Sequence, residues 1–484
     1  MEPDVNTGGW IRRTTLLLAA GSVLLGAMAL RLGPEVADDG AFFLRYAENL
    51  AAGDPWVWNP REPPVWGASA PLFPVVLALP IVVGLPTVPS AVGISLLLAA
   101  SGLLLVAWLL GTRFGALAGT AFVILAALDT ELMYYAAAGL ETPLTVAWLA
   151  LAIWVLLGDP PPWAAGAVAG FLAVQKLDLL PAAALLLAAH GVRRRRLPGR
   201  EAVIAAAIGL AWYGFAWLHF GAPVPNAFLT KLLHQGDLRP IIDASWFRNL
   251  VLKAGVHEWL AGLSLLAVLR WRRQLAPLGL FLGGLLLTHL IAYTLWHPFE
   301  PYNWYGIPSV LSLLVLGSIG LAATGDLLRR RLPRAAIGLP VLLLVAVIAD
   351  GIPDARRTTA EILGFASHEE HDRAEAGRWV QAHTPEDFVV YTMWGNPAYH
   401  SGRRVIDGSF LNRPFEPGDP VARYRPEVLI LQNEPGSTPA RPAFAATDGT
   451  GYTVVRVFDR SYRRGIDYFF AVLVRDDVLG DLRP

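Results

Sequence analysis

Long apolar runs separated by short polar stretches dominate the first 350 residues of the chain. A helix that spans a membrane needs about 20 consecutive, mainly apolar residues, and several of the runs reach or approach that length. The pattern therefore predicts about eleven spanning helices. We place them at 14–32, 91–111, 116–135, 142–158, 163–176, 178–191, 202–220, 257–270, 275–296, 304–323 and 335–350.

Short arginine clusters between the apolar runs indicate which side of the membrane each connection faces. They lie at 12–13, 113, 193–196, 270–273 and 329–334. Cytoplasmic loops are enriched in Lys and Arg, so we expect all of these clusters, and the N-terminus, on the cytoplasmic side. A full crossing by the apolar stretch 70–85 would put the later clusters on the wrong side. We therefore expect an interfacial or re-entrant helix there, which the prolines at 71–89 suit.

The pattern changes after residue 350. A charged segment at 356–373 has helical periodicity, and short β-rich runs follow at 388–391, 428–431, 452–458 and 468–474. We predict a polytopic α-helical membrane domain over 1–350, with its first outside loop at 33–90. A small extracytoplasmic α/β domain is expected over 351–484.

The composition agrees with a membrane class and excludes some alternatives. Hydrophobic residues make up 54% of the 484-residue chain and charged residues 16%, with a mean hydropathy of +0.45. A net charge of +0 gives no field that would gather nucleic acid, and the absence of cysteine excludes disulfides and thiolate metal sites. The first apolar run lacks a convincing cleavage site, so we expect a retained helix in a multi-pass protein of the plasma (inner) membrane.

Acidic and basic residues embedded in apolar sequence gather in the connections predicted to lie outside. On a helix, Asp38 shares a face with Arg45, whereas Asp39 lies about 100° away. Glu141 begins a span, and Lys176 and Asp178 interrupt an apolar hairpin at its outside turn. Purely structural explanations remain open for each site. An acidic residue can offset a helix dipole, and a lysine that reaches toward the membrane surface can form an ion pair with a neighbouring acid.

Two later outside connections add further polar residues. One carries Asn226 and Lys231, and the other carries His297, Glu300 and Tyr302 within an aromatic-rich stretch. A belt of interfacial aromatic residues explains the rings but not the histidine or the glutamate. Because five separate connections supply such groups, we predict a polar pocket at the outer membrane surface.

These residue types suit the transfer of a sugar from a lipid phosphate. A carboxylate can remove the proton of an attacking sugar hydroxyl while cations hold the phosphate leaving group. Asp38 or Asp39 is the candidate base, and Asp38 is favoured because it shares a face with Arg45. The candidate catalytic residues are Asp38, Asp39 and Glu141, and the candidate donor-phosphate or substrate-binding residues are Arg45, Lys176, Asp178, Asn226, Lys231, His297, Glu300 and Tyr302.

Neither a bound metal nor a cytoplasmic nucleotide is indicated. His368 and His371 have a spacing that suits a metal, but their charged neighbours favour a solvated helix face, so we predict no metal site and leave a divalent cation open. The chain also lacks a glycine-rich phosphate loop that ends in Lys-Ser or Lys-Thr.

Several short motifs resemble one known group of membrane enzymes. The first outside loop contains an acidic pair, two aromatic residues, Arg-Tyr-Ala, Asn-Leu, a glycine and Asn-Pro, and Gly-Leu-Glu-Thr-Pro follows at 139–143. Further matches are Pro225-Asn226 with Phe228 and Lys231, Gly-Arg-Trp-Val at 377–380, Thr384-Pro385, Tyr399 and Val-Ile-Asp at 405–407. This set resembles the GT-C superfamily of membrane glycosyltransferases, most closely the terminal arabinofuranosyltransferase type of actinobacterial cell-wall synthesis.

The resemblance implies a polyprenyl-phosphate sugar donor, a cell-envelope glycan or protein acceptor, and a catalytic base within the acidic pair. Arabinofuranose is one candidate sugar. The chain departs from the family at 61–66 and at Lys176-Leu177-Asp178, where the family tends to have Arg-Pro and an acid, so the sugar and the acceptor stay open. Two other classes remain: a transporter or flippase of lipid-linked sugars, although no internal repeat is evident, and a non-catalytic envelope-assembly protein.

Overall fold

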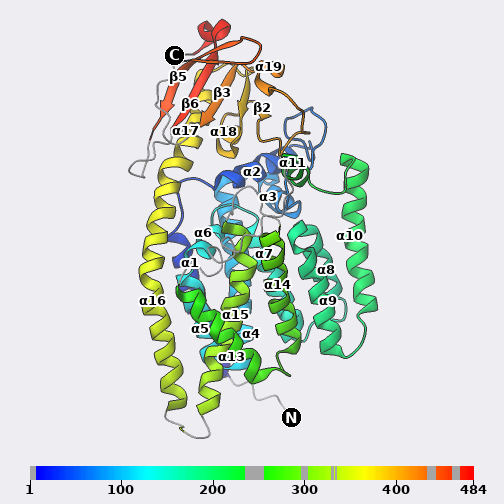
Figure 1. The fold of residues 1–484 in the computed structure, drawn as a ribbon, viewed down its shortest axis with the longest axis vertical. Coiled ribbons are helices and arrows are strands. Elements are labelled where there is room, and N and C mark those ends of the chain that lie inside the picture. Colours follow the sequence, from blue (N-terminus) through cyan, green and yellow to red (C-terminus); the bar gives the residue numbers. More distant parts are fainter. Residues whose placement is uncertain are drawn as a thin grey trace.

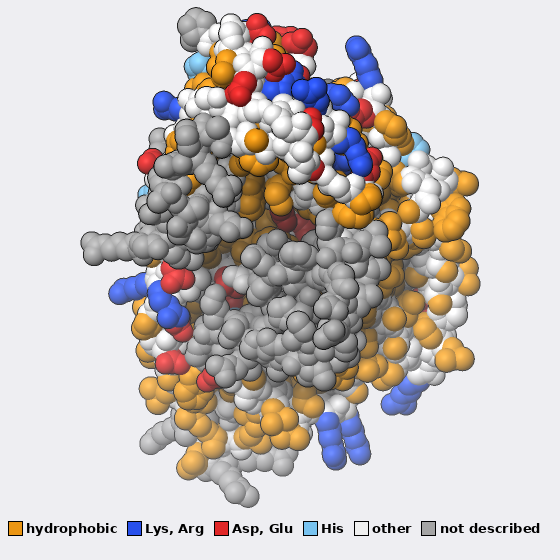
Figure 2. All heavy atoms as spheres, turned by 45° about the horizontal axis from the view of Figure 1, so that its top comes forward, with side chains coloured by type: hydrophobic (Ala, Val, Ile, Leu, Met, Phe, Trp, Pro, Cys, Tyr) orange, Lys and Arg blue, Asp and Glu red, His pale blue; other side chains and the backbone are white. Residues whose placement is uncertain are grey.

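The computed structural model describes residues 7–234, 255–295, 303–328, 332, 335–432, 443–459 and 469–483. Figure 1 shows two parts, a tall bundle of helices and a smaller domain with a β-sheet above it, which contains the C-terminal end of the chain. Figure 2 shows that charged side chains gather on the upper domain, while hydrophobic side chains cover much of the bundle visible in this view.

The helices of the bundle coincide with the predicted spans. They are α1 (Thr7–Ala29), α4 (Thr87–Phe114), α5 (Ala116–Leu128), α7 (Thr142–Leu157), α8 (Ala164–Gln175), α9 (Leu180–Arg194), α10 (Gly199–Phe220), α13 (Gly255–Trp271), α14 (Ala276–Leu295), α15 (Ile307–Leu328) and α16 (Ala335–Phe365). Among the described residues, five helices are long and apolar enough to cross a membrane. The class of a helical membrane protein is thus supported, whereas the count of about eleven crossings stays a prediction.

Short helices occupy the junction between the bundle and the upper domain. They are α2 (Asp38–Ala51), α3 (Leu72–Val82) and α11 (Asn226–His234) (Figure 1), with α6 (Thr130–Tyr135) just below them. With 11 residues, α3 is about 16 Å long, which is too short for a hydrocarbon core of about 30 Å. This length agrees with the interfacial or re-entrant helix expected at 70–85.

The basic connections share one end of the molecule. The links α4–α5, α9–α10 and α13–α14, which follow or contain arginine clusters, lie at the end of the bundle opposite the upper domain (Figure 1). Basic side chains also project from this end in Figure 2. The arrangement matches the predicted segregation of charge, and which end faces the cytoplasm stays a prediction.

Small residues let the central helix α15 pack closely against its neighbours. A Cβ atom added to Gly320 would lie 1.8 Å from the carbonyl oxygen of Leu263 on α13, and one added to Gly317 would lie 2.5 Å from Leu260. Helices in a membrane gain no hydrophobic energy from one another, so such close backbone contact is a main source of their association. Almost every residue of α15 is buried as a result.

The helix α16 passes through the expected domain boundary at 350 without a break. It continues to Phe365 and leads through a short π-helix, η3 (Ala366–Glu370), into α17 (His371–His383). The six strands of the upper domain have the order β2-β1-β3-β6-β5-β4, in which β1 is parallel to β2 and β3 and the other pairs are antiparallel. Their bounds are β1 (Val389–Thr392), β2 (Arg404–Asp407), β3 (Val428–Gln432), β4 (Ala443–Ala445), β5 (Gly451–Phe458) and β6 (Phe470–Arg475).

The four predicted β-rich runs coincide with β1, β3, β5 and β6, whereas β2 and β4 were not predicted as strands. Both are edge strands of three or four residues, too short to show an alternating pattern. Two helices complete the domain, α18 (Gly395–His400) and α19 (Pro420–Tyr424).

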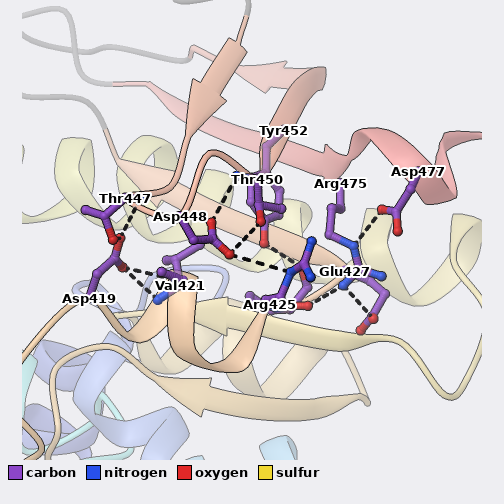
Figure 3. Close-up of polar contacts among 12 residues, drawn as sticks. Asp419, Val421, Arg425, Glu427, Thr447, Asp448, Thr450, Tyr452, Arg475 and Asp477 are labelled. Carbon is purple, nitrogen blue, oxygen red and sulfur yellow. Dashed lines mark hydrogen bonds and ion pairs between the residues drawn. The ribbon is translucent and has the colours of Figure 1, made fainter.

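A polar network fixes one region of the sheet and its turns (Figure 3). The Asp419 carboxylate accepts hydrogen bonds from the backbone N–H of Val421 and from Thr447. On the right of Figure 3, Arg475 forms ion pairs with Glu427 at 2.9 Å and with Asp477 at 2.6 Å. Each of these charged groups has a partner within the domain, so we assign them a structural role.

Candidate functional site

A cavity of about 280 Å³ lies at the junction of the bundle and the upper domain. Its wall combines the start of α2, the loop at 67–69, the start of α7, the turn between α8 and α9, the start of α11, the upper part of α14, the short helix η2 (Asn303–Gly306) and a loop of the upper domain. The lining residues are Asp39, Phe42, Phe43, Gly67, Ala68, Ser69, Glu141, Lys176, Leu177, Asp178, Pro181, Pro225, Ala227, Phe228, Thr288, His289, Ala292, Tyr293, Trp304, Tyr305, Leu411 and Asn412.

Four of the predicted site residues, Asp39, Glu141, Lys176 and Asp178, line this one cavity. The Lys176 ammonium lies 2.8 Å from Glu141 and 3.8 Å from Asp178, with side-chain exposures of 12%, 4% and 23% respectively. The ring of Tyr305 covers the ammonium at 4.4 Å. The ion pair of Lys176 with Asp178, expected as a purely structural explanation of these two residues, is thus present. It also includes Glu141, and all three residues are part of the cavity wall.

Close backbone packing brings Asp39 and Glu141 to the same cavity. A Cβ atom at Gly40 would lie 2.9 Å from the carbonyl oxygen of Gly139, and the backbone N–H of Ala37 donates to the carbonyl of Ala138 at 2.8 Å. The first turn of α2 therefore rests on the segment that precedes Glu141. Phe42 and Phe43, one turn further along α2, continue the cavity wall from Asp39.

Asp38 lies outside the cavity, in the contact between α2 and the upper domain. Its two carboxylate oxygens accept hydrogen bonds from the backbone N–H groups of Gly395 at 2.9 Å and Asn396 at 2.8 Å. Its own N–H donates to Glu370 at 3.3 Å. Burial raises the pKa of Glu370 to about 7, because Arg373 only partly offsets the burial and the Asp38 carboxylate adds to its effect.

Arg45 belongs to the same contact and does not line the cavity. Its guanidinium donates hydrogen bonds of 2.7–2.9 Å to the carbonyls of Trp58, Ala398 and Arg403 and to Asn59. The shared face of Asp38 and Arg45 is therefore the face of α2 that packs on the upper domain. Both side chains are used in contacts within and with the upper domain, and a catalytic role for Asp38 or a phosphate-binding role for Arg45 stays a prediction.

Asn226 also ties the two parts together. Its amide nitrogen donates to the carbonyls of Phe410, Leu411 and Arg413, at 2.6–3.1 Å. Phe410 has a left-handed φ of 56° at this point. The contact holds the loop that presents Leu411 and Asn412 to the cavity, so Asn226 supports the wall and does not line it.

The other predicted residues are placed as follows. His297, Glu300 and Tyr302 lie outside the described residues, and so does the side chain of Lys231, although its backbone is part of α11. Three tryptophans of the first outside loop make contacts elsewhere: Trp58 donates to the carbonyl of Val405 at 3.1 Å, and Trp56 and Trp66 pack on Trp212 of α10. These three tryptophans are absent from the cavity wall.

A second ionic contact holds the upper domain next to the first outside loop. Glu35 lies 2.7 Å from Arg378 and 3.2 Å from His371 on α17, and 3.6 Å from His400 on α18. Burial alone would raise the pKa of Glu35, but the nearby His400 and the hydrogen-bonded Arg378 outweigh it and lower the pKa to about 2. In the part of the chain that the structure describes, no group of three His, Cys, Asp or Glu residues could hold a metal ion.

Several residues of the cavity were missed by the sequence reasoning. His289 and Tyr293, one turn apart on α14, are polar groups in an apolar span, and that is a signal of function which could have found them. Tyr305 belongs to the aromatic-rich stretch at 296–305, whose rings the sequence pattern attributed to an interfacial belt. Leu411 and Asn412 come from the upper domain, and no local pattern connects them to the membrane residues.

No protein-family profile and no curated protein matches the sequence. The fold, in contrast, resembles solved structures. ArnT from Cupriavidus metallidurans is 15% identical with a TM-score of 0.60, over 96% of this chain and 98% of ArnT. The structure of ArnT bound to undecaprenyl phosphate gives a TM-score of 0.60 at 14% identity, with the same coverage of both chains.

An oligosaccharyltransferase of Archaeoglobus fulgidus has a similar fold at 13% identity and a TM-score of 0.53, over 87% of this chain and 69% of the oligosaccharyltransferase. The archaeal oligosaccharyltransferase AglB of that organism, in complex with an inhibitory peptide and a dolichol-phosphate, has a TM-score of 0.51 at 15% identity, with 82% and 64% of the two chains covered. At 13–15% identity these likenesses show a shared fold, and both the GT-C superfamily and the arabinofuranosyltransferase type stay predictions.

Proposed function

We propose that this protein is a GT-C-type glycosyltransferase that moves a sugar from a polyprenyl-phosphate donor to a cell-envelope glycan or protein acceptor on the extracytoplasmic face. The observation that carries the proposal is the convergence of Asp39, Glu141, Lys176 and Asp178 on one cavity. The fold is shared with ArnT, which has been solved with undecaprenyl phosphate, and with AglB, which has been solved with a dolichol-phosphate. Arabinofuranose is one candidate sugar, because the motifs at 38–60 and 139–143 resemble those of the arabinofuranosyltransferase type.

In this proposal Asp39 is the general base. Its carboxylate takes the proton of the acceptor hydroxyl while the acceptor oxygen forms a bond to the anomeric carbon of the donor. The bond between that carbon and the phosphate oxygen breaks, and the polyprenyl phosphate leaves with the electron pair. Asp39 replaces Asp38 as the preferred base because both oxygens of Asp38 accept backbone hydrogen bonds away from the cavity.

In this proposal Lys176, which lines the cavity, holds the phosphate. An ammonium group has three donors, and Glu141 takes one from Lys176 at 2.8 Å, so the others are available to a phosphate oxygen. Glu141 is then a positioning residue that orients Lys176. Lys231, which belongs to the motif at 225–231, is the second proposed phosphate partner.

A matched pair of substitutions tests the base. In purified protein supplied with a panel of polyprenyl-phosphate sugars, we expect Asp39→Asn to lower kcat about 100-fold or more, with unchanged thermal unfolding. Asp38→Asn makes the same chemical change one residue away and is expected to lower the unfolding temperature instead. Unchanged transfer by Asp39→Asn would remove the proposed base.

The transporter alternative predicts a different result. A flippase moves labelled lipid-linked sugar across the membrane of proteoliposomes when no acceptor is present, whereas a transferase consumes the lipid only when acceptor is added. The sidedness is tested separately, because the chain has no native cysteine. We expect Gly53→Cys to react with an impermeant maleimide from outside and Arg195→Cys to react only after permeabilisation.

A further inference from the structure

Two buried polar atoms on one side of the cavity have no hydrogen-bond partner among the described residues. They are Oδ1 of Asp178 and Nε2 of His289, and both residues line the cavity. Buried polar atoms in folded proteins nearly always have a hydrogen-bond partner, so each of these two atoms requires an explanation. A bound molecule that supplies the missing partners is the explanation that their place in a cavity wall favours.

The remaining polar atoms of these side chains are held by the protein. Tyr293 donates to Oδ2 of Asp178 at 3.1 Å, and Nδ1 of His289 lies 3.0 Å from the hydroxyl of Ser309. The rings of His289 and Tyr293 meet edge to face at 5.5 Å. The side chains are therefore oriented before any ligand binds, which lowers the entropy cost of binding.

The unpaired atoms select the chemistry of the ligand. A carboxylate oxygen only accepts, and Nε2 donates or accepts depending on which nitrogen of the ring carries the proton. A hydroxyl group satisfies both atoms in either case, because it donates and accepts. A phosphate oxygen is an acceptor that the negative charge of Asp178 repels, so the unpaired Oδ1 suits a hydroxyl group and not a phosphate oxygen.

We propose that Asp178, His289 and Tyr293 form the subsite that binds the hydroxyl groups of the donor sugar. The proposal rests on the proposed transferase function. It adds which residues of the cavity recognise the sugar part of the donor. The cavity of about 280 Å³ has room for a sugar ring beside these three side chains.

The test compares two lipids on the same variants. Binding of undecaprenyl phosphate alone and of undecaprenyl-phosphate monosaccharides is measured by native mass spectrometry on the full chain in detergent. His289→Leu removes both ring nitrogens, and His289→Gln keeps a polar group near the position of Nε2. His219→Leu is the matched control, because His219 is a histidine of α10 that stacks on Phe215 and does not line the cavity.

We expect His289→Leu to weaken binding of the preferred glycosylated lipid about 10- to 100-fold and to leave the bare carrier within twofold. His289→Gln should recover part of the loss, and His219→Leu should change neither lipid. An equal loss for both lipids, or no loss for either, overturns the subsite. If the wild-type protein transfers sugar and His289→Leu still prefers the glycosylated lipid over the bare carrier, only this inference is refuted. A wild-type protein that neither prefers nor transfers any sugar lipid refutes the proposed function as well.

Discussion

Replacing Lys176 with methionine removes the ammonium group that lies between two carboxylates of the cavity wall. At 2.8 Å from Glu141 and 3.8 Å from Asp178, the attractions are about 6 and about 4 kcal/mol at an effective dielectric constant near 20. Much of this attraction offsets the desolvation of the charges. The measurable loss from breaking such a buried pair is about 3–5 kcal/mol, because Glu141 is left buried and uncompensated.

A double-mutant cycle separates the pair from the general effect of each substitution. We expect Glu141→Gln alone to cost less than Lys176→Met, since Asp178 still compensates the lysine, and the double variant to recover about 2–3 kcal/mol of the summed losses. The free energy of unfolding is followed in detergent by the fluorescence of the 17 tryptophans during denaturant titration. A coupling energy below about 0.5 kcal/mol would refute the claim that the two residues form one buried pair.

Three other substitutions test the junction and the bundle. Arg45→Met removes four hydrogen bonds of a buried guanidinium, so we expect a loss of about 3–5 kcal/mol and faster proteolysis of the upper domain; unchanged proteolysis would contradict the assigned role. Glu35→Gln should cost about 3 kcal/mol at pH 7, because the folded pKa of about 2 lies below the ordinary value of 4.5. That stabilisation is present above pH 4.5 and is lost as the pH falls toward 2, so the two proteins should converge in acid titrations unless the contact is absent. Gly320→Ala should destabilise the bundle by more than about 3 kcal/mol in thermal unfolding, while Gly262→Ala, whose added Cβ meets nothing within 4 Å, should be close to neutral; equal effects would contradict the packing.

Local patterns were sufficient to predict the class of the protein and most of its elements. The length of an apolar run and the position of arginine clusters depend only on neighbouring residues, and the helices and basic connections lie where these patterns put them. The edge strands β2 and β4 were missed because three or four residues hold too little alternation. The boundary expected at 350 falls inside α16, whose upper part changes from apolar to charged without any break in the backbone.

For the candidate site, helical periodicity correctly indicated that Asp38 and Arg45 share a face of α2. It contained no information about the partner of that face, which turned out to be the upper domain. Asp39, whose side chain points about 100° away, faces the cavity instead. A periodic pattern defines angles around a helix axis, and the contacts of each angle depend on elements that are distant in the sequence.

The sequence by itself determined that this is a helical membrane protein with basic connections at one end, and that acids and a lysine interrupt its apolar runs. Hydrophobic burial and charge segregation act on short segments, so these properties can be read residue by residue. Only the tertiary structure decided which of those polar residues meet, since the cavity joins α2, α7, α14 and a loop of the upper domain. Long-range backbone contacts such as that of Gly40 with Gly139 make this meeting possible, and no local pattern specifies them.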